Sequence, residues 1–444
     1  MVNLGIGSPS CRKNIDEHMF RNVNLRACLI VALCCTRALA NGRAPITNTI
    51  HFDRADPHAL YIGSTFGLLI SHDDGCSLHW VCEANLGYAG TWDPKYAIGT
   101  DGAIFATTFS GLEISRDGGC SFAMATVDLP KPARGRIADK WIDALDLGPT
   151  GDVWVGTAIS GAPNDVYVSH DDGVSFAPVG LESPRIFWKS VRVAPSNLAR
   201  VYAAGYEVAR PAAHLEVTSD LGRTWTAAAL GGVAVGATPI VYVAAIDPHD
   251  PDTLFLISVG ATRAGDQLYR SRDAGRSFAL VLDSPGPIGD VVVRGADVYV
   301  ATQRQTGAAK IAGPAFHSRD GGATFGPWAG APALACLGAA PDGALIGCAA
   351  TSLVRMEPGG AWTSIWQLGE LSGPLACPAG TPEHDRCNAA EIAALSTSQP
   401  ACRAAPSFAP APPSKGCDAG GESGLVAVLV LLVALGYARS RQLG

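Results

Sequence analysis

Three tryptophans at related positions carry the side chains best suited to bind a sugar. They are Trp92, Trp141 and Trp188, which precede the aromatic residues Phe105, Trp154 and Tyr202 of β-rich runs at nearly the same spacing, one position longer in the third case. Lysines accompany them, namely Lys95, Lys140 and Lys189. Indole rings stack on sugar faces, and ammonium groups pair with the carboxylates of an acidic glycan. The alternative is that a tryptophan at a repeated position packs as a wedge between structural units.

Carboxylates near these tryptophans suggest a second chemistry. Asp93, Asp139, Asp143 and Glu207 could supply the acid/base pair that glycosidases use, but their spacing is not diagnostic. The sequence has no Gly-rich phosphate loop, no nucleophile elbow and no metal-binding histidine spacing. We therefore predict no catalytic residue, no cofactor and no metal.

A motif of the form Ser-x-Asp-x-Gly-x-(Ser/Thr)-aromatic recurs at a nearly regular interval, and a period of roughly 50 residues is typical of repeat architectures. The copies begin at Ser71, Ser115, Ser169, Thr218, Ser271 and Ser318, and their aspartates are Asp73, Asp117, Asp171, Asp220, Asp273 and Asp320. The carboxylate can accept hydrogen bonds from backbone N–H groups a few residues on, and the glycine supplies a positive φ. We expect these aspartates to hold turns and not to catalyse.

Each motif belongs to a unit of four short β-rich runs, which is the composition of a propeller blade. A seventh unit keeps the rhythm but has Glu357-Pro-Gly-Gly-Ala-Trp362 in place of the motif. The sequence therefore predicts an all-β fold, a single β-propeller of seven four-stranded blades over residues 46–370. The turns that carry the motif fall on one face, so binding is expected on the opposite face.

The motif resembles the Asp-box, or BNR, repeat of sialidases, sortilin-type receptors, photosystem II stability factors and xyloglucanases. A typical sialidase needs a tyrosine nucleophile late in the propeller, whereas the last tyrosine before the C-terminal tail is Tyr299. Xyloglucanases of this type place two catalytic carboxylates in a cleft between two propellers, whereas this chain has only one propeller. The resemblance thus implies the scaffold and leaves the chemistry open.

The two ends of the chain read as export and anchoring signals. Residues 1–40 have a basic segment, an apolar run and Ala38-Leu39-Ala40, as in a signal peptide, and Met19 is the expected true start. After a Cys-containing extension (371–397) and a Pro/Ala-rich spacer (398–416), residues 417–444 hold Gly-Cys417, a short hydrophobic helix and arginines. This order resembles the myxobacterial MYXO-CTERM sorting tag, which implies that Cys417 is the anchoring position. A plain membrane anchor is the alternative.

The cysteines agree with an exported protein, since eight of the 13 fall between the two signals. Cys336 and Cys348 flank a turn and should be bonded across a hairpin. Cys377 and Cys387 are the second pair expected, while the pairing of Cys76, Cys82, Cys120 and Cys402 is left open. The body from 41 to 416 has 26 basic and 36 acidic residues, a net charge of −10, which excludes a footprint for nucleic acid.

These observations predict an exported, surface-anchored propeller that is noncatalytic and presents a face to a glycan or protein ligand. A secreted glycoside hydrolase or lyase on the same scaffold is the alternative.

Overall fold

The computed structural model describes residues 45–88, 92–306, 309–349, 351–357, 359–393 and 395–398. The signal peptide, the spacer after residue 398 and the sorting tag with Cys417 lie outside these ranges, so those predictions stay predictions. Within the described ranges no helix is long and apolar enough to cross a membrane.

The described strands form seven antiparallel sheets of consecutive strands. They are, sheet by sheet, β1 (Thr47–Phe52), β2 (Leu60–Ser64), β3 (Gly67–Ser71) and β4 (His79–Cys82); β5 (Tyr96–Ile98), β6 (Ile104–Thr107), β7 (Leu112–Ser115) and β8 (Ala123–Met124); β9 (Ile142–Leu147), β10 (Val153–Thr157), β11 (Val166–Ser169) and β12 (Ala177–Pro178); β13 (Phe187–Val193), β14 (Val201–Glu207), β15 (Ala212–Thr218) and β16 (Thr226–Ala227); β17 (Val241–Ile246), β18 (Leu254–Ser258), β19 (Gln267–Ser271) and β20 (Ala279–Asp283); β21 (Ile288–Arg294), β22 (Asp297–Thr306), β23 (Ala309–Ala312), β24 (Phe316–Ser318) and β25 (Gly326–Pro327); β26 (Cys336–Ala339), β27 (Leu345–Ala349), β28 (Ser352–Met356) and β29 (Trp362–Gln367).

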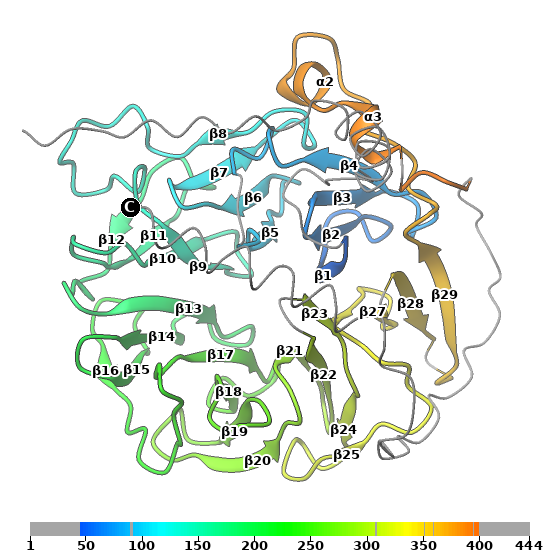
Figure 1. The fold of residues 1–444 in the computed structure, drawn as a ribbon. Coiled ribbons are helices and arrows are strands. Elements are labelled where there is room, and N and C mark those ends of the chain that lie inside the picture. Colours follow the sequence, from blue (N-terminus) through cyan, green and yellow to red (C-terminus); the bar gives the residue numbers. More distant parts are fainter. Residues whose placement is uncertain are drawn as a thin grey trace, which may run out of the picture. The chain divides into compact units, whose positions relative to one another are not determined.

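The sheets are the blades of a propeller, as predicted (Figure 1). The first strand of each sheet lies nearest the centre and packs against the first strands of its two neighbours, and β26 packs against β1 to complete the ring. The sixth sheet carries one extra strand, β23, which pairs with β22. Among the described strands, no sheet combines strands from both ends of the chain.

The hydrophobic core is divided among the seams between neighbouring blades. Seven clusters of buried apolar side chains each join two adjacent sheets. Trp154 and Trp188, both 1% exposed, fill the seam between the third and fourth sheets. Because strand side chains alternate, each middle strand supplies apolar residues to the seams on both of its faces.

The repeated aspartates hold the turns between third and fourth strands. In the fifth sheet Asp273 accepts hydrogen bonds from Ser271 Oγ at 2.7 Å, Ser277 N at 2.9 Å and Ser277 Oγ at 2.5 Å. The same three bonds recur at the aspartates of the other five copies, which are Asp73, Asp117, Asp171, Asp220 and Asp320. These bonds lower the pKa of Asp273 to about 2, with Ser277 Oγ as the largest cause.

The motif glycine has a positive φ in every copy, and the residue before it does too. That residue is Asp74, Gly118, Asp172, Leu221, Ala274 or Gly321, so four of the six turns place a non-glycine residue in the left-handed region. The glycine also permits close packing: a Cβ on Gly322 would collide with the Phe255 ring of the preceding blade. Each motif therefore fixes both a turn and a seam.

Residues 371–398, here called the C-terminal strap, leave the seventh blade and run along the outer edge of the first. Trp80 N donates to Gly373 O at 2.8 Å, and Leu375 N donates to Trp80 O at 2.7 Å, so the strap extends the sheet beyond β4. The strap continues into α2 (Pro382–Arg386) and α3 (Ala389–Ile392), which lie beside the first sheet (Figure 1).

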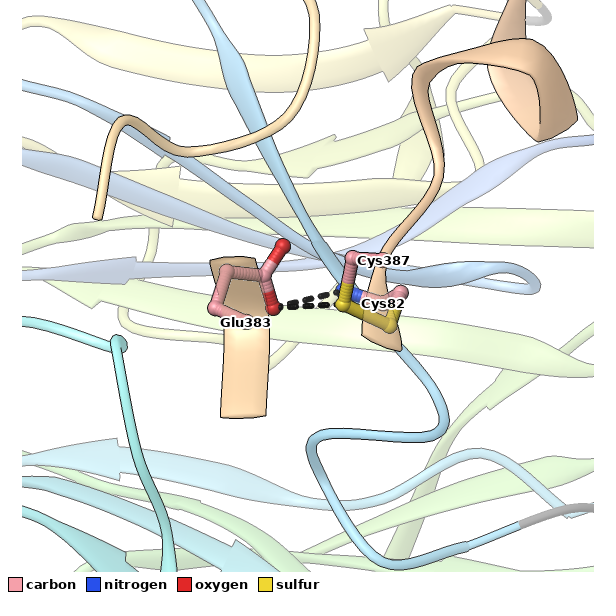
Figure 2. A group of neighbouring side chains, drawn as sticks. All are labelled: Cys82, Glu383 and Cys387. Atoms are coloured by element: carbon pink, nitrogen blue, oxygen red, sulfur yellow. Dashed lines mark hydrogen bonds between the residues drawn. A yellow bond between two sulfur atoms is a disulfide. The ribbon is translucent and has the colours of Figure 1, made fainter. Parts of the chain in front are cut away.

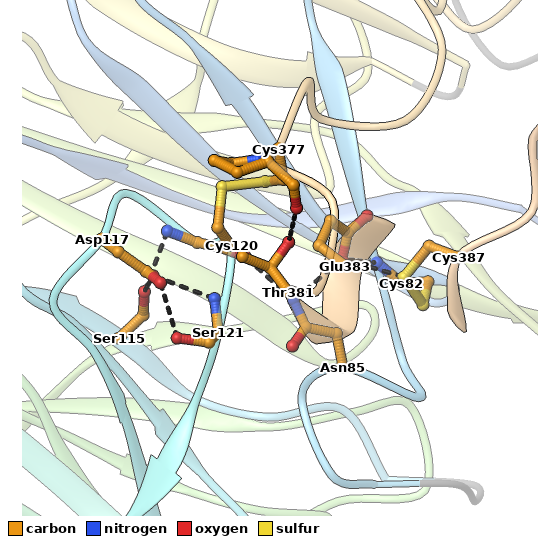
Figure 3. Close-up of a disulfide and its surroundings, with 12 residues drawn as sticks. Cys82, Asn85, Ser115, Asp117, Cys120, Ser121, Cys377, Thr381, Glu383 and Cys387 are labelled. Carbon is orange, nitrogen blue, oxygen red and sulfur yellow. Dashed lines mark hydrogen bonds between the residues drawn. A yellow bond between two sulfur atoms is a disulfide. The ribbon is translucent and has the colours of Figure 1, made fainter. Parts of the chain in front are cut away.

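Two disulfides fix the strap to the first two blades. Cys82 is bonded to Cys387 and Cys120 to Cys377, over sequence separations of 305 and 257 (Figure 3). The predicted Cys377–Cys387 pair is therefore wrong, because each of these cysteines faces a different blade. The predicted Cys336–Cys348 bridge is present, across paired residues of β26 and β27. Cys76 is disulfide-bonded as well.

Glu383 of α2 lies in the interior beside one of these disulfides (Figure 2). Its side chain is fully buried. Oε2 accepts hydrogen bonds from Asn85 Nδ2 at 2.9 Å and Cys82 N at 3.3 Å, and Cys387 Sγ lies 2.9 Å from the same oxygen. Burial raises the pKa of this carboxyl to about 7.

Candidate functional site

The antiparallel order of each blade defines two faces. The turns between first and second strands and the motif turns lie on one, here called the bottom face. The turns between second and third strands and the connections between blades lie on the other, the top face. The segments before β5 and β9, which carry Trp92 and Trp141, therefore lie at or near the top, whereas Trp188 is the second residue of β13.

Two of those tryptophans form an exposed aromatic group with a phenylalanine. Trp92 is 60% exposed, and its ring lies 6.5 Å from that of the partly buried Trp141. Phe109, 45% exposed, lies 5.1 Å from Trp141 on the other side. Phe109 comes from the short turn between β6 and β7, and sequence reasoning missed it. The available signal was a large apolar residue at the tip of a polar turn, Thr108 to Gly111.

Trp188 does not belong to this group. It is 1% exposed and packs in the seam between the third and fourth blades, where Gly156 and Gly205 leave room for its side chain. The prediction of Trp188 as a sugar platform is thus wrong, and the wedge interpretation holds for this residue.

Two of the predicted lysines meet at the carboxylate of Asp143, which follows Trp141 by two residues in the chain. Lys189 Nζ lies 2.9 and 2.8 Å from the two oxygens of Asp143. Lys95 Nζ donates to the backbone oxygens of Asp143 and Lys189 and lies 3.3 Å from Asp143 Oδ1. Protein atoms surround the Lys95 ammonium although 41% of its side chain is exposed, and this desolvation lowers its pKa to about 8, against the attraction of Asp143. The three groups together carry one net positive charge.

Lys140 is directed elsewhere. Its Nζ lies 2.5 Å from the Tyr167 hydroxyl and 4.8 Å from the centre of the Tyr167 ring. Tyr167 belongs to the seam between the second and third blades, so Lys140 does not accompany Trp141 as predicted.

The predicted carboxylates do not assemble into an acid/base pair. Asp139 forms ion pairs with Lys131 at 2.7 Å and Arg136 at 2.6 Å, which lower its pKa. Glu207 pairs with Arg185 at 3.1 Å and lies 3.2 Å from His214 Nε2. Asp93 accepts from Asn48 Nδ2 at 2.7 Å, and Asp143 is held by the two lysines.

Titratable residues of the first strands form a second group that the sequence did not reveal. Burial raises the pKa of Asp290 on β21 to about 7, with Arg192 opposing the shift, and it accepts from Leu337 N at 3.0 Å. Burial and Arg192 lower the pKa of His51 on β1 to about 4. Arg192 on β13 pairs with Asp146 at 3.2 Å. Its influence on residues of β1 and β21 places this group at the inner edges of the blades.

Among the described residues, one group offers three metal-type ligand atoms within 4.8 Å of one another: Cys82, Glu383 and Cys387. Its two sulfurs are bonded to each other, so the group is a covalent link between β4 and the strap (Figure 2).

No protein-family model and no curated protein sequence matches the chain. An ancestral GH74 enzyme has a similar fold, with a TM-score of 0.53, 14% identity, and coverage of 74% of this chain and 50% of that one. The GH74 xyloglucanase from Xanthomonas campestris aligns with a TM-score of 0.42, 16% identity and coverage of 72% and 66%. YCF48 from Cyanidioschyzon merolae aligns with a TM-score of 0.47 and 14% identity, with coverage of 71% of this chain and 97% of that one. The chain thus spans half the length of the ancestral GH74 enzyme, and the likeness establishes the propeller fold alone.

Proposed function

We propose that this protein is an exported, surface-anchored, noncatalytic propeller that binds a carboxylated glycan on its top face. The observation that carries the proposal is the exposed group of Trp92, Phe109 and Trp141 beside the lysine pair that shares Asp143. Export and anchoring rest on the signal peptide and on the resemblance of residues 417–444 to a sorting tag. The Asp-box resemblance supplies a scaffold that hosts both receptors and enzymes.

The geometry suits an acidic sugar in two ways. Exposure of aromatic rings to water is unfavourable, and a sugar face that stacks on them removes this apolar surface from water. Lys95 and Lys189 share the single carboxylate of Asp143, so the group has one excess positive charge that a ligand carboxylate would balance. An acidic glycan meets both needs at once.

The noncatalytic part of the proposal rests on the state of the carboxylates. A carboxyl group that acts as a general acid must be protonated at the working pH, which requires a raised pKa. Asp139, Asp143 and Glu207 are instead bound to cations on this face.

Binding to arrays of neutral and acidic polysaccharides tests the proposal. We expect Trp92→Ala/Trp141→Ala to weaken binding at least about tenfold, a loss typical for removal of stacked rings. Lys95→Met should reduce the preference for acidic over neutral glycans while leaving neutral binding in place. Val174→Ala, an apolar residue 68% exposed on the bottom face, is the matched control and should change nothing. Equal binding by the double variant and the control would contradict the proposal, and capture of a protein ligand alone would replace the glycan.

One observation favours the hydrolase alternative. Asp290 is a carboxyl at the inner edge of the sixth blade with a pKa of about 7, which is suitable for a general acid. Hydrolysis of any glycoside by the wild-type protein, abolished in Asp290→Asn with unchanged binding, would establish catalysis and reject the noncatalytic proposal.

A further inference from the structure

A pocket of about 530 Å³ opens in the seam between the third and fourth blades, apart from the site proposed above. One wall is the segment that connects these blades, from Val179 to Ser183. The opposite wall comes from β15 and the following motif turn, and Trp188 lines the interior.

The pocket exists because one repeat position departs from its equivalents. The residue two positions before each motif Ser or Thr points into the seam with the preceding blade. Large apolar side chains fill that position in four blades, and they are Leu69, Tyr167, Tyr269 and Phe316. In the fourth blade the residue is Glu216, whose side chain is less bulky than these four, and the seam is open there.

The second blade shows that a glutamate alone does not make a pocket. Glu113 occupies the equivalent position and is 7% exposed. A Cβ on Gly87 would lie 3.2 Å from Glu113 Oε1, so the loop that contains Gly87 packs directly on the carboxyl. Burial raises the pKa of both glutamates. Glu113 and Glu216 therefore form a matched pair, one covered and one facing a pocket.

Aromatic rings and carboxylates together line the open seam. Trp225 is fixed there, because its Nε1 donates to Val179 O at 3.2 Å and Gly222 O at 3.1 Å. Trp188 lies deeper, is 1% exposed, and its Nε1 has no hydrogen-bond acceptor among the described residues. Glu182 and Glu216 add two negative charges, and Arg223, exposed at the rim, adds one positive charge. The pocket thus offers one partly exposed indole ring, that of Trp225, and a net charge of −1.

We propose that this pocket binds an organic monocation, an ammonium group on an apolar stem such as a lysine side chain. Indole faces attract cations, and most strongly where water is excluded. The half-buried Glu216 carboxylate supplies the counter-charge, and the apolar stem covers the Trp225 ring and Ile186. The negative body of the chain, which has more acidic than basic residues, favours the approach of a cation.

Calorimetric titration of the full chain with N-acetyl-lysine methylamide tests the proposal, with N-acetyl-norleucine methylamide, which has the same four-carbon stem without the ammonium group, as the paired probe. We expect the lysine probe to bind at least about tenfold more tightly, as for a hydrogen bond to a charged group. Glu216→Gln should remove about the same factor, while Glu113→Gln should leave binding unchanged.

Three further measurements sharpen the test. Trp225→Phe keeps the ring type that other copies carry at this position and should weaken the lysine probe severalfold. Arg223→Gln removes the repelling charge and should strengthen it. Butylammonium binding as tightly as the lysine probe would indicate a free amine as ligand, and weaker binding would indicate a peptide. Equal binding of the two paired probes, an unaffected Glu216→Gln variant, or no binding of the lysine probe at millimolar concentrations would overturn the proposal.

Discussion

Removal of the disulfide between the second blade and the strap, by Cys120→Ala/Cys377→Ala, should destabilise the protein by an amount that the ring geometry sets. With Cys82–Cys387 still formed, the second bond no longer closes the whole stretch between its own cysteines. It closes only the two short segments between the bonds, from Cys82 to Cys120 and from Cys377 to Cys387, whose combined length is the difference between the separations of 305 and 257. In the chain-entropy treatment a loop of roughly 50 residues corresponds to about 4 kcal/mol.

Equilibrium unfolding in guanidinium under oxidising conditions measures this loss, and calorimetry should show a melting temperature lower by about 5 °C for a protein of this size. The Cys336–Cys348 bridge spans a separation of only 12 within one hairpin, so Cys336→Ala/Cys348→Ala should lose less, about 3 kcal/mol. Limited proteolysis provides a second readout, because only the first variant should expose the strap to cleavage. A loss below about 1 kcal/mol with an uncut strap would refute the claim that this bond fixes the strap to the second blade.

Two further predictions concern the strap and the seams. Because burial raises the pKa of Glu383 to about 7 from its ordinary 4.5, the folded state holds the proton more tightly, and the contribution of this group to stability is fully present below pH 4.5 and is lost as the pH rises through 7. Glu383→Gln should abolish this loss of stability, which amounts to up to about 3 kcal/mol. The melting temperatures of variant and wild type should therefore differ at pH 8 and converge at pH 4. A difference that stays the same at both pH values would contradict the prediction. Gly322→Ala should destabilise the protein by several kcal/mol, because the residue has a positive φ and its new Cβ would collide with Phe255. Gly118→Ala, with a similar φ of 72° but open space around the Cβ, should cost only about 1–2 kcal/mol. Equal melting temperatures of the two variants would show that the seam is not tightly packed.

The fold could be predicted because its determinants are local and repeated. Each motif holds its own turn through bonds between residues close together in the chain, so six copies suffice to mark the blades. The Cys336–Cys348 bridge was predictable for the same reason, since a turn sets its register. The two strap disulfides were not, because they join residues whose proximity depends on closure of the whole ring.

The candidate site was predictable only in part. Trp92, Trp141 and Lys95 lie in the segments before β5 and β9 and Lys189 lies near the start of β13, whereas Trp188 is buried in a seam. The signal was the spacing from Trp188 to Tyr202, which is one position longer than that from Trp141 to Trp154. Strand side chains alternate, so a shift of a single position exchanges the two sides of the sheet. Lys189, which precedes Tyr202 by the same number of residues as Trp141 precedes Trp154, is therefore the equivalent of Trp141 in its blade. The ion pairs that occupy Asp139 and Glu207 depend on contacts between loops, which repeat spacing does not specify.

The strap has a mechanical consequence for a chain held by its C-terminal end. Once the hydrogen bonds of Thr397 and Ser398 to Gly369 had given way, a tensile force applied at residue 398 would reach Cys387 and Cys377 along the chain before β29, and the two covalent bonds would pass it into β4 and the turn at Cys120. The load would be shared by two neighbouring blades, and β29 would not be peeled from its sheet. A tether attached beyond the strap would therefore pull on a covalently closed ring.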